Sequence, residues 1–105
     1  VQQNSSCRMK SVQLADIDAA ARVLMCCPQS TRSRMVAQML AQAETADKYR
    51  RRLRKPHPQF GSGTLMSVAA KYPQAVRVDC FDDDALDAFS HVIKALIVQK
   101  AHHSL

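Results

Sequence analysis

Hydrophobic and polar positions follow a helical period over two long segments in the first half of the chain. In residues 14–27, apolar side chains recur every three or four residues. Asp16, near the start of this segment, is an acidic residue of the type that caps helices. Pro28 disfavours helical geometry in the residue before it. In residues 30–55, the apolar positions fall within one arc of about 100° around a helix. These patterns predict helices over 16–27 and 30–55.

A third long pattern and a shorter one occupy the second half. Residues 82–101 begin with three aspartates, which suit the positive end of a helix dipole, and apolar residues follow at helical spacing. Residues 63–71 begin at Gly63, the second of the two glycines, and end before Pro73, which indicates a short helix. The sequence therefore predicts an all-α fold, a small irregular bundle of three substantial helices (16–27, 30–55, 82–101) and one short helix (63–71).

One segment has the alternation of a strand. Val76, Val78 and Cys80 share one side of residues 74–81. A single strand has no partner for its backbone, and a stable sheet needs about three strands. We therefore expect an extended connector here.

The 105 residues suffice for one small domain, which we expect to span 12–101. Residues 1–11 are predicted to be a disordered extension and residues 102–105 a frayed tail. No apolar run approaches the length of a membrane span, and no hydrophobic signal segment is present.

The four cysteines lack the C-x2-4-C spacing of a zinc knuckle, since Cys26 and Cys27 are adjacent. We interpret them as free thiols in a reducing compartment, so we expect a cytoplasmic protein with no metal and no cofactor.

Basic residues concentrate in one part of the chain. Lys and Arg number 15 and Asp and Glu 9, giving a formal charge of +6. Residues 1–58 hold 11 basic and 4 acidic side chains, whereas 59–105 hold 4 and 5. The basic cluster consists of Lys48, Arg51, Arg52, Arg54 and Lys55. Such a cluster attracts nucleic-acid phosphates without reading sequence, or it is a solvated helix end whose cations complement the dipole.

Arg50 departs from this pattern because it falls inside the apolar arc of residues 30–55. A charge in such a position is costly unless it is paired. We expect a structural role, in which Arg50 meets a backbone carbonyl or a carboxylate from another helix. The candidate acids are Asp16, Asp18 and Asp87.

The turn Gly61-Ser62-Gly63-Thr64 opens the predicted short helix. Free N–H groups at a helix start can bind an anion such as a phosphate or carboxylate, and Arg54, Lys55 and His57 lie just upstream. The alternative is a capped turn whose glycines permit positive φ. His57 lies between two prolines and is the best-placed candidate for catalysis. Catalysis needs a positioned partner, which the sequence does not identify, so no catalytic residue is assigned.

Three stretches resemble a known family: AAARVL at 19–24, AETADKYRRR at 43–52 and HPQFGSGTLM at 57–66. The chain is similar to a small family of uncharacterised alphaproteobacterial proteins, found in Rhodobacter relatives. Their last stretch reads His-Pro, an aromatic residue, then Gly-x-Gly-Ser-Leu-Met. Phe60 stands at the aromatic position and Thr64 at the serine position. The resemblance implies a bacterial, intracellular, all-α domain with no known activity.

The apolar stripes over 30–55 and 82–101 either form the core or exceed what a domain of this size can bury, and a surplus would imply self-association or a protein partner. The methionines Met25, Met35, Met39 and Met66 are adaptable side chains of the type found at partner surfaces. The favoured hypothesis is therefore a non-enzymatic helical interaction module that binds a protein partner or itself. The alternatives are a sequence-tolerant nucleic-acid or anion binder and an enzyme built around His57.

Overall fold

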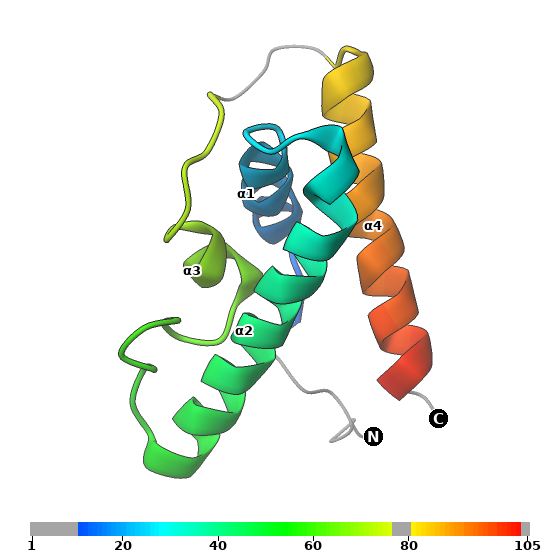
Figure 1. Ribbon diagram of the computed structural model, residues 1–105. Helices are drawn as coiled ribbons and strands as arrows, with labels where there is room; N and C mark the ends of the chain where they lie inside the picture. Colours follow the sequence, from blue (N-terminus) through cyan, green and yellow to red (C-terminus); the bar gives the residue numbers. More distant parts are fainter. Residues whose placement is uncertain (1–10, 77–80, 104–105) are drawn as a thin grey trace.

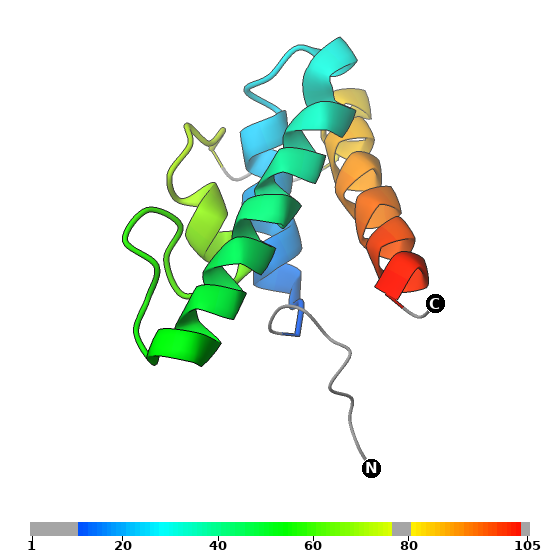
Figure 2. The ribbon, with the colours of Figure 1, turned by 60° about the horizontal axis from the view of Figure 1, so that its bottom comes forward.

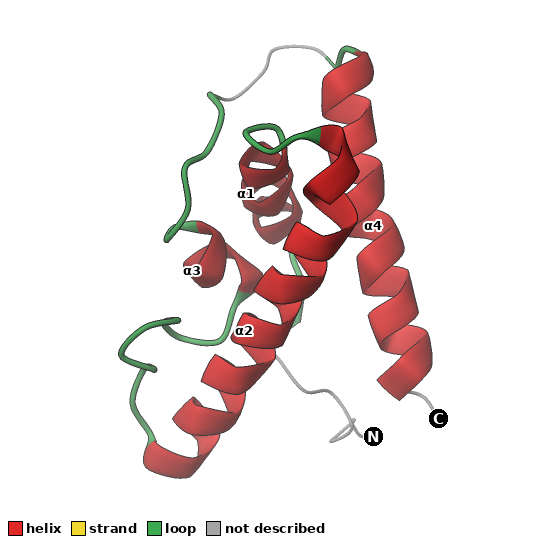
Figure 3. Ribbon diagram, in the orientation of Figure 1, coloured by secondary structure: helices red, strands yellow, loops and turns green. Residues whose placement is uncertain are grey.

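The computed structural model describes residues 11–76 and 81–103, and within these ranges the regular structure is entirely helical. The predicted all-α class, with three substantial helices and one short helix, is confirmed. The elements in chain order are α1 (Leu14–Leu24), the 3-10 turn η1 (Gln29–Thr31), α2 (Arg32–Leu53), α3 (Leu65–Ala69) and α4 (Asp83–His103). Figure 3 shows that loops join these helices throughout the described ranges.

Helix α1 packs against α2, α3 and α4 and forms the centre of the bundle. Helices α2 and α4 approach each other near their N-terminal ends and diverge toward their C-terminal ends (Figure 1). The second view shows the same divergence, with α1 passing behind α2 (Figure 2).

The core is built largely from alanine, with a few larger aliphatic side chains. Leu24, Met39 and Leu65 are the largest apolar side chains that are fully buried. Between them lie many alanines with almost no exposed surface, among them Ala20, Ala21, Ala43, Ala69 and Ala88. Small side chains allow the helices to approach closely, so a chain with no tryptophan still fills its core.

The first helix begins two residues earlier than predicted, and Asp16 is not its N-cap. Gln13 is the cap, and Asp16 occupies the third helical position, where its Oδ2 accepts a hydrogen bond from the Gln13 N–H at 2.8 Å. This is the acidic half of a capping box, in which the third helical residue accepts the N–H of the N-cap residue. The helix ends at Leu24 because residues 25–27 form a turn ahead of Pro28.

The observed helix α2 is shorter at both ends than the helix predicted over 30–55. Residues 29–31 form the 3-10 turn, and α2 stops at Leu53 because Arg54 adopts the left-handed conformation at φ 61°. At the other end of the chain, α4 continues two residues beyond the predicted end at 101, since no proline or glycine follows to stop it.

The segment before α4 is anchored to α1. The Ala75 N–H donates to the Arg22 carbonyl at 3.0 Å, and Arg22 Nε donates to the Ala75 carbonyl at 2.7 Å. Residues 74–76 have no regular structure. The rest of the predicted connector, residues 77–80, lies outside the described residues, as does most of the predicted extension over 1–11.

Candidate functional site

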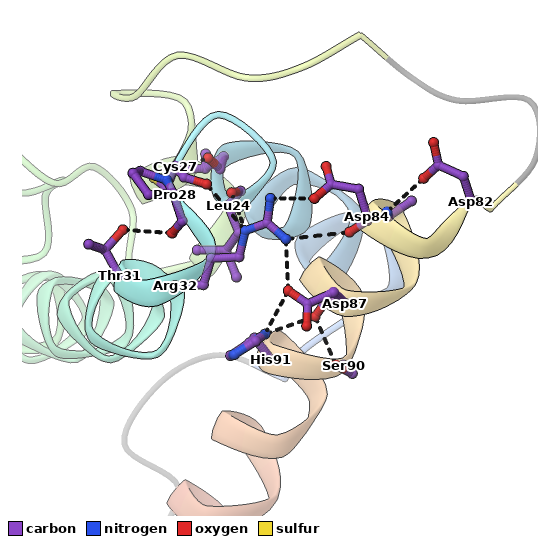
Figure 4. Close-up of polar contacts among 12 residues, drawn as sticks. Leu24, Cys27, Pro28, Thr31, Arg32, Asp82, Asp84, Asp87, Ser90 and His91 are labelled. Atoms are coloured by element: carbon purple, nitrogen blue, oxygen red, sulfur yellow. Dashed lines mark hydrogen bonds and ion pairs between the residues drawn. The ribbon is translucent and has the colours of Figure 1, made fainter.

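A buried arginine joins three helices where α2 and α4 meet. The Arg32 side chain is 3% exposed and begins α2. Its Nε donates to the Leu24 carbonyl at the end of α1, at 2.8 Å. Its two terminal nitrogens donate to Asp84 and Asp87 on α4, each at 2.7 Å (Figure 4). This Arg32 clamp fixes the start of α4 relative to α1 and α2.

Two opposing effects act on the guanidinium. Burial lowers the pKa of Arg32, but the hydrogen bonds and negative charges of Asp84 and Asp87 more than offset this and raise the pKa above its ordinary value. The clamp therefore keeps its positive charge at any pH at which the protein is handled. His91 extends the network, since its Nδ1 lies 2.9 Å from the Asp87 carbonyl oxygen.

Sequence reasoning missed this clamp, although a signal was present. A cation at a helix N-terminus is disfavoured by the helix dipole, which indicates that Arg32 needs a carboxylate partner from another part of the chain. Asp84 and Asp87 are three residues apart and share one face of α4, so they can hold one guanidinium together.

Beyond the clamp, the divergence of α2 and α4 leaves an open groove of about 600 Å³. Its lining is mostly apolar and includes Val36, Leu40, Ala95 and Val98. Val36 and Leu40 already belong to the core, whereas Val98 is 66% exposed.

The other flank of α4 also exposes large apolar side chains. Leu86 is 54% exposed, Ile93 45% and Ile97 62%. In residues 92–98, six of seven side chains are apolar, and Val92 is the fully buried one. This part of α4 is apolar around most of its circumference, a pattern typical of a helix that is enclosed by other helices.

Asp47 forms ion pairs with Arg51 of the basic cluster and with Arg50. Its side chain is fully buried, and its two oxygens lie 2.7 Å from Arg50 and 2.5 Å from Arg51. Arg50 also donates to the Ser62 carbonyl at 3.1 Å. The backbone carbonyl expected for Arg50 is therefore present, but its acid comes from the same helix. The remaining cluster residues Lys48, Arg52, Arg54 and Lys55 are exposed.

The three acids suggested for Arg50 have other partners. Asp16 binds the Met66 and Gln13 N–H groups, Asp18 lies 3.4 Å from Arg22, and Asp87 belongs to the Arg32 clamp. Of the two partners expected for Arg50, the backbone carbonyl is present as Ser62, and the carboxylate comes from the preceding turn of α2, as the buried Asp47, and not from another helix.

Side chains of the protein itself accept hydrogen bonds from the backbone N–H groups at the start of α3. Thr64 is the N-cap, and its Oγ1 accepts from the Ser67 N–H at 3.1 Å. Asp16 accepts from the Met66 N–H at 2.9 Å. Ser62 and Ser67 hydroxyls lie 2.9 Å apart, and Gly61 and Gly63 have positive φ. These contacts use N–H groups that an external anion would need, and so favour the capped-turn interpretation.

His57 organises the loop between α2 and α3. Its Nδ1 accepts the backbone N–H groups of Gln59 and Phe60 at 3.0 and 3.1 Å. Its ring stacks on Phe60 and meets the edge of Tyr49, with centroids 4.8 Å apart in both cases. The geometry places His57 in a turn-stabilising role. Among the described residues, no group of three His, Cys, Asp or Glu side chains is arranged to hold a metal ion.

The fold and these surfaces define a small all-helical domain held by an internal charged clamp. The chain belongs to the family described as a domain of unknown function, DUF7742, whose model matches residues 10–96. No curated protein and no solved structure matches the chain significantly. No described helix combines the length and apolar character needed to cross a bilayer.

Proposed function

We propose that this chain is a non-enzymatic helical interaction module whose binding surface is the exposed flank of α4. The observation that carries the proposal is the exposure of Leu86, Ile93 and Ile97 at helical spacing on one side of α4. Large apolar side chains gathered in this way mark a protein contact more often than an ordinary solvated face.

The rest of the fold supports a rigid presentation of this surface. The Arg32 clamp fixes the first turns of α4, and Val92 anchors its middle in the core. A helix held in this way loses little conformational entropy when a partner binds. The core packing and the binding surface therefore use different faces of one helix.

A photo-crosslinking amino acid placed at Ile97 is expected to capture a protein partner in cells that express the protein. Arg34 is the matched control, because it is exposed on α2 away from this flank. Adducts should form from position 97 and not from position 34. Equal labelling from both positions, or none from position 97, would contradict the proposal.

The basic cluster supports a second candidate function, sequence-tolerant binding of nucleic acid. Four of its exposed members, Lys48, Arg52, Arg54 and Lys55, lie at one end of α2 and outside the Asp47 ion pair. Each phosphate contact contributes a slope of about −0.9 to the salt dependence on duplex DNA. Four contacts would then reduce affinity roughly a hundredfold between about 50 and 200 mM salt.

Replacing these four residues with glutamine is expected to abolish that salt-dependent affinity while helix content is retained. Arg51 is left in place because it is bound to the buried Asp47. Circular dichroism checks the fold, and titration of a fluorescent duplex at the two salt concentrations gives the slope. Absence of binding by the unmodified protein at the lower salt concentration removes this candidate.

A further inference from the structure

Six residues on the exposed flank of α4 have the spacing of a coiled-coil seam. Successive members are separated by three, four, three, four and three residues, the alternation of a and d positions in a heptad. The seam consists of Asp83, Leu86, Ser90, Ile93, Ile97 and Lys100. It is apolar at three positions, small at Ser90, and has opposite charges at its two ends.

This seam lies on a face of α4 that the core does not use. Ala85, Ala88 and Val92 are fully buried and mark the face packed into the bundle. On a helix that turns 100° per residue, the seam is centred roughly 140° away from them. The monomer therefore leaves the apolar residues of the seam, Leu86, Ile93 and Ile97, available to a partner.

Resting on the proposed function, we propose that the partner is a second copy of this chain, whose α4 packs antiparallel along the same seam. Antiparallel pairing about a midpoint between His91 and Val92 matches the seam with itself. Asp83 then faces the partner's Lys100, Leu86 faces the partner's Ile97, and Ser90 faces the partner's Ile93. Twofold symmetry produces each of these contacts twice.

Charge selects the antiparallel direction. Asp82 and Asp83 lie exposed at the start of α4, and Lys94 and Lys100 lie toward its end. A parallel pair would place like charges and like helix ends together, whereas an antiparallel pair opposes both. Exposed ion pairs contribute little free energy. The apolar residues therefore supply the affinity, and the charges set the orientation.

The one polar residue inside the seam is already satisfied. Ser90 Oγ donates to the Asp87 carbonyl at 2.8 Å, so burying Ser90 does not strand its hydroxyl. A single helical seam is a small interface, and we expect a weak dimer that forms with rising concentration.

Sedimentation analysis from micromolar to millimolar concentration tests the proposal. The mass should rise from 11.7 kDa toward twice that value. Ile93→Glu places two charges in the seam, one from each copy, and should weaken the dimer by at least about a hundredfold. Val98→Glu is the matched control, because Val98 is 66% exposed on the same helix but faces the groove, and it should leave the dimer intact.

Thiol cross-linking tests the orientation, in a background with the four native cysteines replaced by serine. The double variant Asp83→Cys/Lys100→Cys should be captured by a short bifunctional maleimide. Either single variant should not, because its two copies lie about 25 Å apart along an antiparallel pair, at 1.5 Å per residue. Efficient cross-linking of the single variants would establish a parallel pair and overturn the proposed orientation.

A protein that stays monomeric at every concentration would overturn self-association. A photo-adduct from position 97 with a different protein would then still support the interaction module, so the two failures are distinguishable. Binding to lipid vesicles that Ile93→Glu abolishes, without a dimer, would assign the seam to a membrane surface and overturn the proposal as well.

Discussion

Arg32→Met is expected to lower the free energy of unfolding by about 2–3 kcal/mol, less than the full cost of stranding a buried charge, because Asp84 and Asp87 stay partly exposed. Arg32 is buried and binds Asp84, Asp87 and the carbonyl of Leu24. Its removal leaves these acceptors without their donor and releases the start of α4 from α1 and α2. Urea denaturation followed by circular dichroism measures the loss.

Two further variants make this prediction specific. Arg34→Met, two residues along the same helix and exposed, should change stability by no more than about 0.5 kcal/mol. Arg32→Lys should recover little, because a single ammonium cannot bind both aspartates and the carbonyl in the guanidinium geometry. Similar losses for Arg32→Met and Arg34→Met would show that the clamp does not stabilise the fold.

Gly63→Ala is the second substitution with a large expected effect, a loss of about 3 kcal/mol or more. Gly63 has φ +100°, and a Cβ there would lie 2.9 Å from the Cα of Asp47. That atom belongs to the backbone of α2, so relief requires moving the whole loop away from the helix. Thermal denaturation of the variant measures the effect.

Gly61→Ala is the matched control. Gly61 also has positive φ, at +83°, but the nearest atom to its added Cβ is the side-chain Cβ of Ser67 at 3.0 Å. The shared conformational penalty should cost about 1–2 kcal/mol, well below the loss at Gly63. Equal losses at the two glycines would show that contact with α2 does not matter.

The helices were predictable because local signals and tertiary packing agree. The apolar period of residues 82–101 and the cap at Asp82, which accepts the Ala85 N–H at 2.9 Å, are both local features. The Arg32 clamp was not predicted because its two acids lie 52 and 55 residues away in the sequence. Only the tertiary packing of α2 against α4 brings them together.

The candidate surfaces were likewise predictable only in part from the sequence. Periodicity indicated a wide apolar face on the last helix, but it did not show which part α1 covers. Ala88 and Val92 are buried, whereas Ile93 and Ile97 are not. The charge count overstated the number of unpaired cations in the basic cluster, because the buried Asp47 pairs with Arg51. The burial of Asp47 depends on the close approach of the Gly63 loop, which the sequence does not show.

NMR signals from the seam residues themselves test the proposed self-association most directly. The protein has three isoleucines, Ile17, Ile93 and Ile97, so a sample labelled at isoleucine δ1-methyls gives one signal from α1 and two from the seam. As concentration rises, the Ile93 and Ile97 signals should shift together toward a bound state while the Ile17 signal stays in place. Seam signals that do not move at any concentration, or a shift confined to Ile17, would contradict the account.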